Sequence, residues 1–236
     1  MPWFPGAIRR PVTRHRTPML RHRGLCLHVA VSEGASLFGY FNQPGNPTSH
    51  FYVRRDGTVE QYVDTRFRAP AQLEGNPSMI SAETQGGVHN VDTEQWTPQQ
   101  VASLARIAAW CHDVHGIRLA LMPDSRSQST GVGPHRLGID PWRVSGGERW
   151  SESYGKICPG AGKIAQIPRI IALARGGDEV TEAQANRIIQ LLEELTAQGR
   201  LMAVRMDSIT NQQLPGLRAD ADRAADVIAG PDHSTP

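Results

Sequence analysis

The stretch "GLCLHVAV", residues 24–31, is almost wholly apolar and carries a single histidine, His28. A short, continuous apolar run is typical of a strand that is buried on both faces of a sheet. We therefore expect residues 24–31 to form a central strand. A histidine inside such a strand has two interpretations: it hydrogen-bonds to a backbone carbonyl within the core, or it is a metal ligand.

The segments that follow predict the neighbours of this strand. "SEGASLFGYF", residues 32–41, predicts a short helix with Ser32 as its cap. "HFYVRRDGTVEQYV", residues 50–63, predicts a hairpin, because two β-rich runs flank the tight-turn pair Asp56-Gly57. "SMISAETQ", residues 78–85, predicts one more strand, which a glutamate interrupts.

Two helices complete the predicted domain. Residues 97–116 have Thr97 as a cap, proline in the first turn and Gly116 at the end, with apolar residues on one stripe that includes Cys111. Residues 162–174 predict a last packed helix, bent at Pro168. This order of elements predicts an α/β fold, with a mixed central β-sheet flanked by helices.

Charge divides the chain at about residue 175. Residues 1–175 carry a net charge of +7 and residues 176–236 carry −5, which together give the overall +2. We expect a first domain over residues 1–175 and an acidic helical appendage over residues 176–236. The apolar residues at heptad-like spacing within residues 181–200 suggest self-association through a coiled coil; a helical tail folded on the domain is the alternative.

A basic body suits an anionic polymer, either nucleic acid or a cell wall. The arginines are scattered and are not interleaved with aromatic residues, so we expect no nucleic-acid binding. The basic N-terminus lacks a continuous apolar segment, and no run approaches the roughly 18 residues that span a bilayer. We therefore expect no signal peptide, no membrane insertion and synthesis in a cytoplasm.

The cysteines suggest separate roles rather than a disulfide framework. Cys26, Cys111 and Cys158 are an odd number and lie far apart in the sequence. Cys158 lies in "KICPG", a turn-rich stretch in which a core thiol is unusual. Cys26 lies two residues before His28, on the same face of the predicted strand. It either competes with Cys158 for a metal ion or is a core residue beneath the site.

Three residues form a candidate metal set. His135 lies in the glycine- and proline-rich stretch "GVGPHRLG", where turns position its side chain. Together with His28 and Cys158, it gives the three nitrogen and sulfur donors that hydrolytic zinc sites commonly use, with a fourth position for water. The spacing alone is weak support, because the sequence has no HExxH or CxxC motif.

Five segments, taken in order, resemble a known family. The combination "LHVAVSE", "SHFYVRRDGTVEQYVD", "ISAETQGG", "GVGPHRLG" and "KICPG" is similar to the zinc-dependent type 2 N-acetylmuramoyl-L-alanine amidases and peptidoglycan recognition proteins, and most similar to endolysin amidase domains of phages of actinobacteria. The resemblance covers about residues 1–175. It implies the type 2 amidase fold, one zinc ion per chain held by His28, His135 and Cys158, and Cys26 as a bystander.

The resemblance also implies catalytic roles. Glu83, at the end of an apolar strand, matches the glutamate that some family members use as the general base and acid. Lys156 precedes Cys158 by two residues, and its ammonium would stabilise the tetrahedral oxyanion. Each has an ordinary alternative as a solvated surface charge. A catalytic tyrosine of other members is replaced by Ser49, which favours the glutamate-dependent mechanism.

Substrate contacts are less well defined. His50 is expected to be structural or a substrate contact rather than a ligand. Trp142 and Trp150 lie in the long connection between His135 and Cys158, where aromatic faces either line a glycan groove or form a small core.

The resemblance implies hydrolysis of the bond between N-acetylmuramic acid and L-alanine in bacterial peptidoglycan. The expected role is that of a phage endolysin, which accumulates in the host cytoplasm and is then released to the wall. Two alternatives are a non-catalytic peptidoglycan-binding protein and a cytoplasmic amidase that recycles soluble muropeptides.

Overall fold

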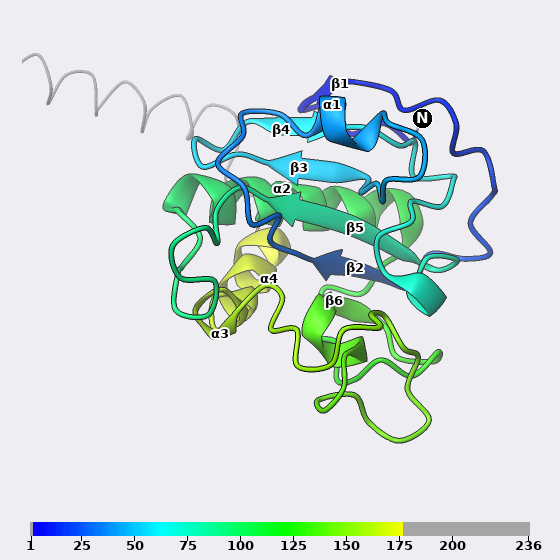
Figure 1. Cartoon of the computed structure of the whole chain (residues 1–236), viewed down its shortest axis with the longest axis vertical. Helices are drawn as coiled ribbons and strands as arrows, with labels where there is room; N and C mark the ends of the chain where they lie inside the picture. The colour runs from blue at the N-terminus through cyan, green and yellow to red at the C-terminus, as the bar shows by residue number, and fades with distance from the viewer. Residues whose placement is uncertain (1, 177–236) are drawn as a thin grey trace, which may run out of the picture. The chain divides into compact units, whose positions relative to one another are not determined.

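We analysed a computed structural model of the chain, which describes residues 2–176 (Figure 1). The predicted appendage, including the 181–200 segment, lies outside the described residues. The described part is a six-stranded mixed sheet with helices packed against it, as predicted. Its strands are β1 (Ala7–Arg9), β2 (Gly24–Leu27), β3 (Phe51–Val53), β4 (Val59–Gln61), β5 (Met79–Thr84) and β6 (Gly131–Pro134). Its helices are α1 (Phe38–Phe41), η1 (Leu73–Gly75), α2 (Pro98–His115), η2 (His135–Gly138), α3 (Ala161–Ile164) and α4 (Ile167–Arg175).

The strand order across the sheet is β1-β4-β3-β5-β2-β6. Every neighbouring pair is parallel except β3 and β4, which form the predicted hairpin. Gly57 takes a φ of 85° in the turn of this hairpin, a conformation that glycine adopts without steric cost. Because β5, β2 and β6 are adjacent and parallel, their carboxyl ends meet at one edge of the sheet.

Helix α2 covers one face of the sheet, and α4 packs beside it (Figure 1). The Thr97 side chain accepts a hydrogen bond from the Gln100 backbone N–H, and the Gln100 side-chain oxygen accepts one from the Thr97 backbone N–H. Gly116 ends the helix in the left-handed conformation. The apolar stripe of α2, with Leu104, Ile107 and Cys111, is buried against β2, β3 and β5. This confirms the predicted helix and the core role of Cys111.

Three element predictions need correction. The helix expected from Ser32 begins only after Leu37, because Ser32 instead forms an antiparallel bridge with Gly86. The helix expected over residues 162–174 is two helices, and Pro168 lies in the first turn of α4 rather than at a bend. The stretch before His135, expected to be a loop, is the edge strand β6, and β1 was not predicted.

None of the helices among residues 2–176 is both long enough and apolar enough to span a bilayer.

Candidate metal centre and active site

The three parallel strands β5, β2 and β6 bring candidate residues together at their carboxyl ends. Leu27, the last residue of β2, pairs with Ala82 of β5 on one side and with Pro134 of β6 on the other. The next residues along the three strands are therefore Glu83, His28 and His135. Residues far apart in the sequence thus become neighbours through strand register alone.

Cys158 joins the two histidines from a separate segment. One donor atom from each of His28, His135 and Cys158 lies within 4.8 Å of the others, and all three residues are buried. The two imidazole rings have centroids 4.3 Å apart. Among residues 2–176 this is the one cluster of three or more histidine, cysteine or acidic residues arranged in this way.

Hydrogen bonds fix the tautomer of His28. Its Nε2 lies 3.2 Å from Oε1 of Gln72, and the Gln72 amide nitrogen donates to the Met79 carbonyl at 3.0 Å. Since Gln72 presents its oxygen, His28 Nε2 must carry the proton and donate. Nδ1 is then left with a free lone pair. Burial, followed by the neighbouring His135, holds the pKa of His28 well below its usual value, so the ring is neutral.

His135 is held in the same way. Its Nε2 donates to the Trp150 backbone carbonyl at 2.9 Å, and its buried Nδ1 has no hydrogen-bond partner. Burial lowers the pKa of His135 to about 4. A buried imidazole nitrogen without a partner carries an energetic cost that a metal ion would remove, because polar atoms in protein interiors are normally satisfied.

Backbone N–H groups from two other segments hold Cys158 in place. Its sulfur accepts a hydrogen bond from the Val29 N–H at 3.4 Å, and its carbonyl accepts one from the Arg136 N–H at 2.9 Å. These contacts tie the Cys158 turn to the residues that follow His28 and His135. Burial, with the nearby Glu83 charge, raises the pKa of the Cys158 thiol to about 12. A bound cation would reverse this, since metal binding displaces the proton of a coordinating thiol.

These residues fit zinc. Bonds of about 2.0–2.3 Å place the donors of tetrahedral zinc roughly 3.5 Å apart, so small side-chain shifts within the cluster are sufficient. Two neutral imidazoles and one thiolate form a set that zinc accepts. The second hydrogen bonds of both histidines, to Gln72 and to the Trp150 carbonyl, are the kind of outer contact that orients a metal ligand. Cys26 is buried beneath the site against Met79, Met122 and Trp150, as expected for a core residue.

Glu83 lies beside the cluster rather than in solvent. One carboxylate oxygen is 3.7 Å from His28 Nδ1, and the other is buried without a hydrogen-bond partner. The side chain is only 18% exposed. Burial raises the pKa of Glu83 to about 7, although the Lys156 charge acts in the opposite direction. A carboxyl with such a pKa can both accept and return a proton near neutral pH.

Lys156 is exposed, and its positive charge reaches the site. The field of Lys156 contributes to lowering the pKa of His28, His135 and Glu83. The Lys156 side chain is therefore accessible to a ligand, and its charge acts on the residues of the cluster.

Burial favours the structural alternative for two of the residues considered as substrate contacts, His50 and Trp150. His50 has no exposed surface, and its ring nitrogens lie 3.0 Å from the Ser81 hydroxyl and 2.9 Å from the Phe67 carbonyl. It is therefore a structural residue. Trp150 is 1% exposed, and its ring packs so closely on Gly138 that a Cβ there would lie 2.2 Å from the indole. It belongs to a core and supports His135 through its carbonyl.

Trp142 remains accessible. It is 40% exposed, and the Arg136 guanidinium lies 5.2 Å from its ring centre, in cation–π contact. Of the two tryptophans expected at a glycan groove, Trp142 is thus the one whose exposure is compatible with that role.

The residues that orient the two histidines carry no signal in the sequence. Gln72, which is fully buried, and the Trp150 carbonyl each lie far from their histidine in the sequence. No local pattern marks either one. Gln72 stands out as a buried polar residue only once the fold is known.

Comparison with known proteins agrees with this geometry. Residues 18–161, more than half of the chain, match the family model described as N-acetylmuramoyl-L-alanine amidase, and every candidate residue lies within this range. A search of curated protein sequences gives no match.

Solved structures share the fold. The endolysin amidase LysCS from Clostridium intestinale URNW is 17% identical with a TM-score of 0.51, over 73% of this chain and 97% of that one. The Staphylococcus aureus hydrolase AmiA is 15% identical with a TM-score of 0.51, over 74% and 87%. A selenomethionine derivative of AmpD is 19% identical with a TM-score of 0.51, over 72% and 96%. Taken with the family match, these findings show that the chain belongs to the N-acetylmuramoyl-L-alanine amidase family.

Proposed function

We propose that this protein is a zinc-dependent N-acetylmuramoyl-L-alanine amidase that acts on peptidoglycan. The bond cleaved joins the lactyl carbonyl of N-acetylmuramic acid to the stem-peptide L-alanine. The observation that carries the proposal is the meeting of His28, His135 and Cys158 with Glu83 at the carboxyl ends of three parallel strands.

His28 and His135 would hold the metal through Nδ1, and Cys158 through its sulfur. When bound, zinc supplies a Lewis acid that polarises the amide carbonyl and lowers the pKa of a coordinated water toward about 7. Gln72 and the Trp150 carbonyl keep the two histidine rings in the orientation that presents Nδ1.

Glu83 is the proposed proton carrier. Its carboxylate accepts a proton from the attacking water and delivers it to the departing nitrogen of L-alanine, which is a poor leaving group unless it is protonated. A single carboxyl can do both because its burial places its pKa near neutrality. Lys156 would compensate the negative charge that develops on the carbonyl oxygen.

The complete donor set favours an enzyme over a binding protein. The buried Nδ1 of His135 has no hydrogen-bond partner, and burial raises the pKa of the nearby Glu83 carboxyl. Catalysis at a metal ion uses both features, whereas a protein that only binds peptidoglycan needs neither. A pure binder would also tolerate loss of the Cys158 sulfur without losing affinity for wall.

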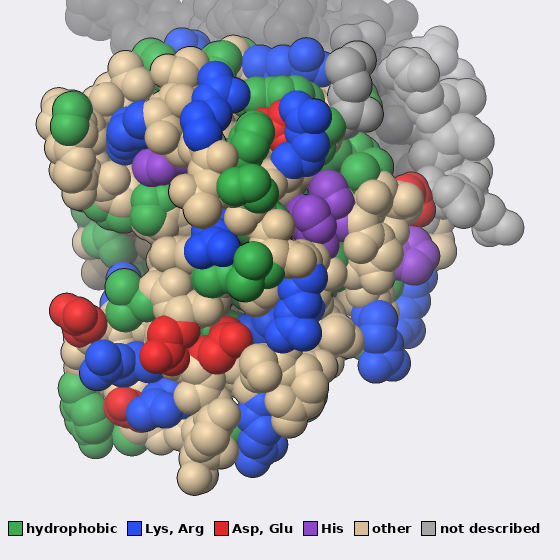
Figure 2. Space-filling view, turned by 90° about the vertical axis from the view of Figure 1, so that its right-hand side faces the viewer, with side chains coloured by type: hydrophobic (Ala, Val, Ile, Leu, Met, Phe, Trp, Pro, Cys, Tyr) green, Lys and Arg blue, Asp and Glu red, His purple; other side chains and the backbone are tan. Residues whose placement is uncertain are grey.

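Polymeric wall is the proposed substrate. Lys and Arg side chains are spread over the face drawn in Figure 2, while most of the acidic side chains visible there lie in its lower left part. The charge of +7 over residues 1–175 favours association with an anionic wall. Because one structural relative is named an endolysin amidase, we extend the proposal to a phage endolysin made in the host cytoplasm. Self-association through residues 181–200 is a separate proposal.

The test is hydrolysis of purified cell wall and of soluble muropeptides by the zinc-loaded and the chelated protein. New α-amino groups on L-alanine should appear with zinc, disappear after chelation and return when zinc is added back. Faster turnover of intact wall would support the endolysin role, while turnover of soluble fragments alone would indicate recycling. Absence of the new amino groups from zinc-loaded protein would refute amidase activity.

A further inference from the structure

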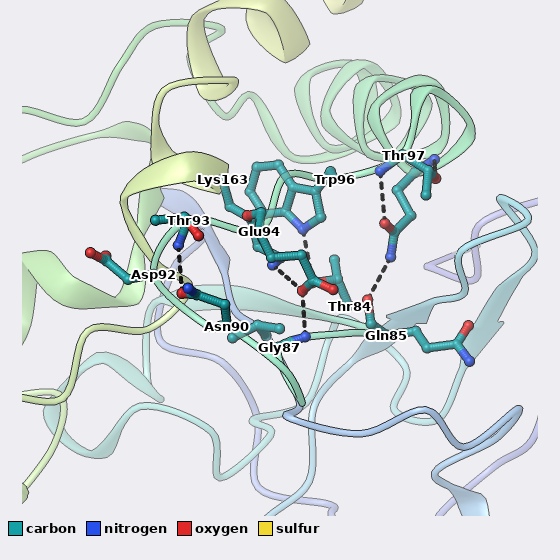
Figure 3. A network of polar contacts seen from close by, with 12 residues as sticks. Thr84, Gln85, Gly87, Asn90, Asp92, Thr93, Glu94, Trp96, Thr97 and Lys163 are labelled. Carbon is teal, nitrogen blue, oxygen red and sulfur yellow. Dashed lines mark hydrogen bonds and ion pairs between the residues drawn. The ribbon is translucent and has the colours of Figure 1, made fainter.

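The connection after β5, residues 86–96, lies against the segment that carries Cys158 and α3 (Figure 3). The Gly162 N–H donates to the Asp92 carbonyl at 2.7 Å, and the Ala161 N–H donates to the Asp92 carboxylate at 2.9 Å. At Gly160, a Cβ would lie 1.8 Å from the Val91 carbonyl oxygen. The two segments are therefore in direct backbone contact immediately after Cys158.

Glu94 is at the centre of this contact. Lys163, in α3, donates to the Glu94 carboxylate at 2.6 Å and to the Glu94 carbonyl at 3.2 Å. The Gly87 N–H and the Arg55 guanidinium donate to the same carboxylate. Lys163 is completely buried, and the Glu94 side chain is 18% exposed. The chain has only two lysines, Lys156 and Lys163, and both lie within five residues of Cys158.

The other end of the 86–96 connection reaches the strand ends. The Trp96 indole N–H donates to the Thr84 hydroxyl at 2.9 Å (Figure 3). The Thr84 hydroxyl in turn donates to the His28 carbonyl at 2.7 Å. Thr84 is also the residue after Glu83. The 86–96 connection thus contacts both the turn that carries Cys158 and the end of β5, and Thr84 at that end holds the His28 carbonyl.

We propose that Glu94 is a positioning residue for the metal centre, and that its pairing with Lys163 sets the distance between Cys158 and the two histidines. Cys158 belongs to neither β2 nor β6, so strand register does not place it. Its sulfur is fixed by the Val29 N–H, and the segment that follows it is anchored through Lys163. This inference rests on the proposed zinc site and goes beyond it by assigning a role to a residue that contacts neither metal nor substrate.

The proposed role of Glu94 requires an ionised carboxylate and not just a side chain of the same size. Burial opposes ionisation, but hydrogen bonds from Lys163, Arg55 and Gly87 outweigh it and lower the pKa of Glu94 to about 2. Lys163 and Gly87 donate to one oxygen and Arg55 to the other. A glutamine would turn its NH₂ group toward at least one of these donors. Glu94→Gln therefore changes the contacts while hardly changing volume.

The experiment compares Glu94→Gln, Lys163→Met and the control Glu33→Gln. Glu33 accepts hydrogen bonds from the same Arg55, at 2.6 and 2.9 Å, but it is exposed and does not contact the Cys158 segment. Zinc dissociation constants are measured on full-length protein by competition with a chromophoric chelator, at a temperature where circular dichroism shows every variant to be folded. Cobalt-substituted protein gives a second readout, because its thiolate charge-transfer band reports the bond to Cys158.

We expect Glu94→Gln and Lys163→Met to weaken zinc binding by about 10–100-fold and to reduce the thiolate band, with Glu33→Gln within twofold of wild type. A lower melting temperature with unchanged zinc affinity and an unchanged cobalt spectrum would overturn the inference and leave a purely structural role. Wild-type protein that binds no zinc would instead overturn the proposed function, and the inference with it.

Asp92→Ala tests separately the neighbouring contact between the same two segments. It removes the contact with the Ala161 N–H but retains the Glu94–Lys163 pair. We expect zinc binding to weaken by a smaller factor, about threefold to tenfold. Affinity equal to wild type would contradict the role of this contact in placing Cys158.

Discussion

Replacing Glu83 with glutamine separates proton transfer from metal binding at this site. The substitution keeps the size of the side chain and removes its ability to accept and return a proton. Glu83 lies 3.7 Å from His28 Nδ1, too far for a hydrogen bond, and is not one of the three clustered donors. Zinc affinity should therefore change by less than about threefold, while turnover should fall sharply.

The structure places the expected loss at the upper end of the range for general acid–base catalysis. Such groups contribute about 10²–10⁴-fold. Two other carboxylates, Glu33 and Glu94, are paired with Arg55 and are not free to replace Glu83. We expect kcat to fall by at least about 10³-fold, equivalent to about 4 kcal/mol of transition-state stabilisation.

The assay measures release of L-alanine amino groups from purified peptidoglycan at saturating zinc, alongside zinc titration of each protein. Glu152→Gln is the control, because Glu152 is an exposed acidic residue in the same connection as Lys156. It should retain wild-type activity. Two results would refute the reasoning: substantial activity in Glu83→Gln with zinc bound, or loss of zinc together with activity, which would make Glu83 a ligand or a structural group.

Three further predictions follow from other contacts. Lys156→Met should lower kcat by about 10²-fold with little change in KM, and unchanged kcat on soluble muropeptide would exclude its role at the oxyanion. Gln72→Leu removes the acceptor for His28 Nε2 and should weaken zinc binding by about tenfold in chelator competition; wild-type affinity would show that the contact does not orient the ring. The pKa of Glu94 lies below its ordinary value, so the ion pairs of Glu94 stabilise the metal-free fold above about pH 5, and this contribution is lost as the pH falls toward 2. The difference in melting temperature between metal-free wild type and Glu94→Gln should therefore shrink on acidification, and a constant difference would contradict the assignment.

Elements with local signals could be predicted from the sequence. Helix α2 has a capping box at Thr97 and a glycine at its end, and the β3–β4 hairpin has Asp56-Gly57 at its turn. These signals depend only on residues that are close in the sequence, so they can be recognised without knowledge of the fold.

Elements defined by distant partners could not be predicted in this way. Strand β6 consists of Gly131–Pro134, which has poor β-propensity, and is a strand because β2 pairs with it. Ser32 resembles a helix cap, but its backbone is used in a bridge with Gly86. In both cases tertiary pairing overrides the local preference.

The site was predictable in part, for the same reason. His28, His135 and Cys158 form a candidate set by their donor atoms, their spacing gives only weak support, and the family resemblance implies that they bind zinc together. The burial of His50 and Trp150 could not be predicted, because it depends on residues from distant parts of the chain that pack over them. Gln72 and Glu94 act through hydrogen bonds to residues far along the chain, so neither could be identified before the structure.

The most direct test of the central claim is the zinc content of the purified protein, measured by elemental analysis on wild type and on His28→Ala. We expect one zinc ion per wild-type chain, and a much lower zinc content in His28→Ala together with loss of amidase activity. A wild-type protein that cleaves the N-acetylmuramoyl-L-alanine bond at full rate without bound metal would contradict it.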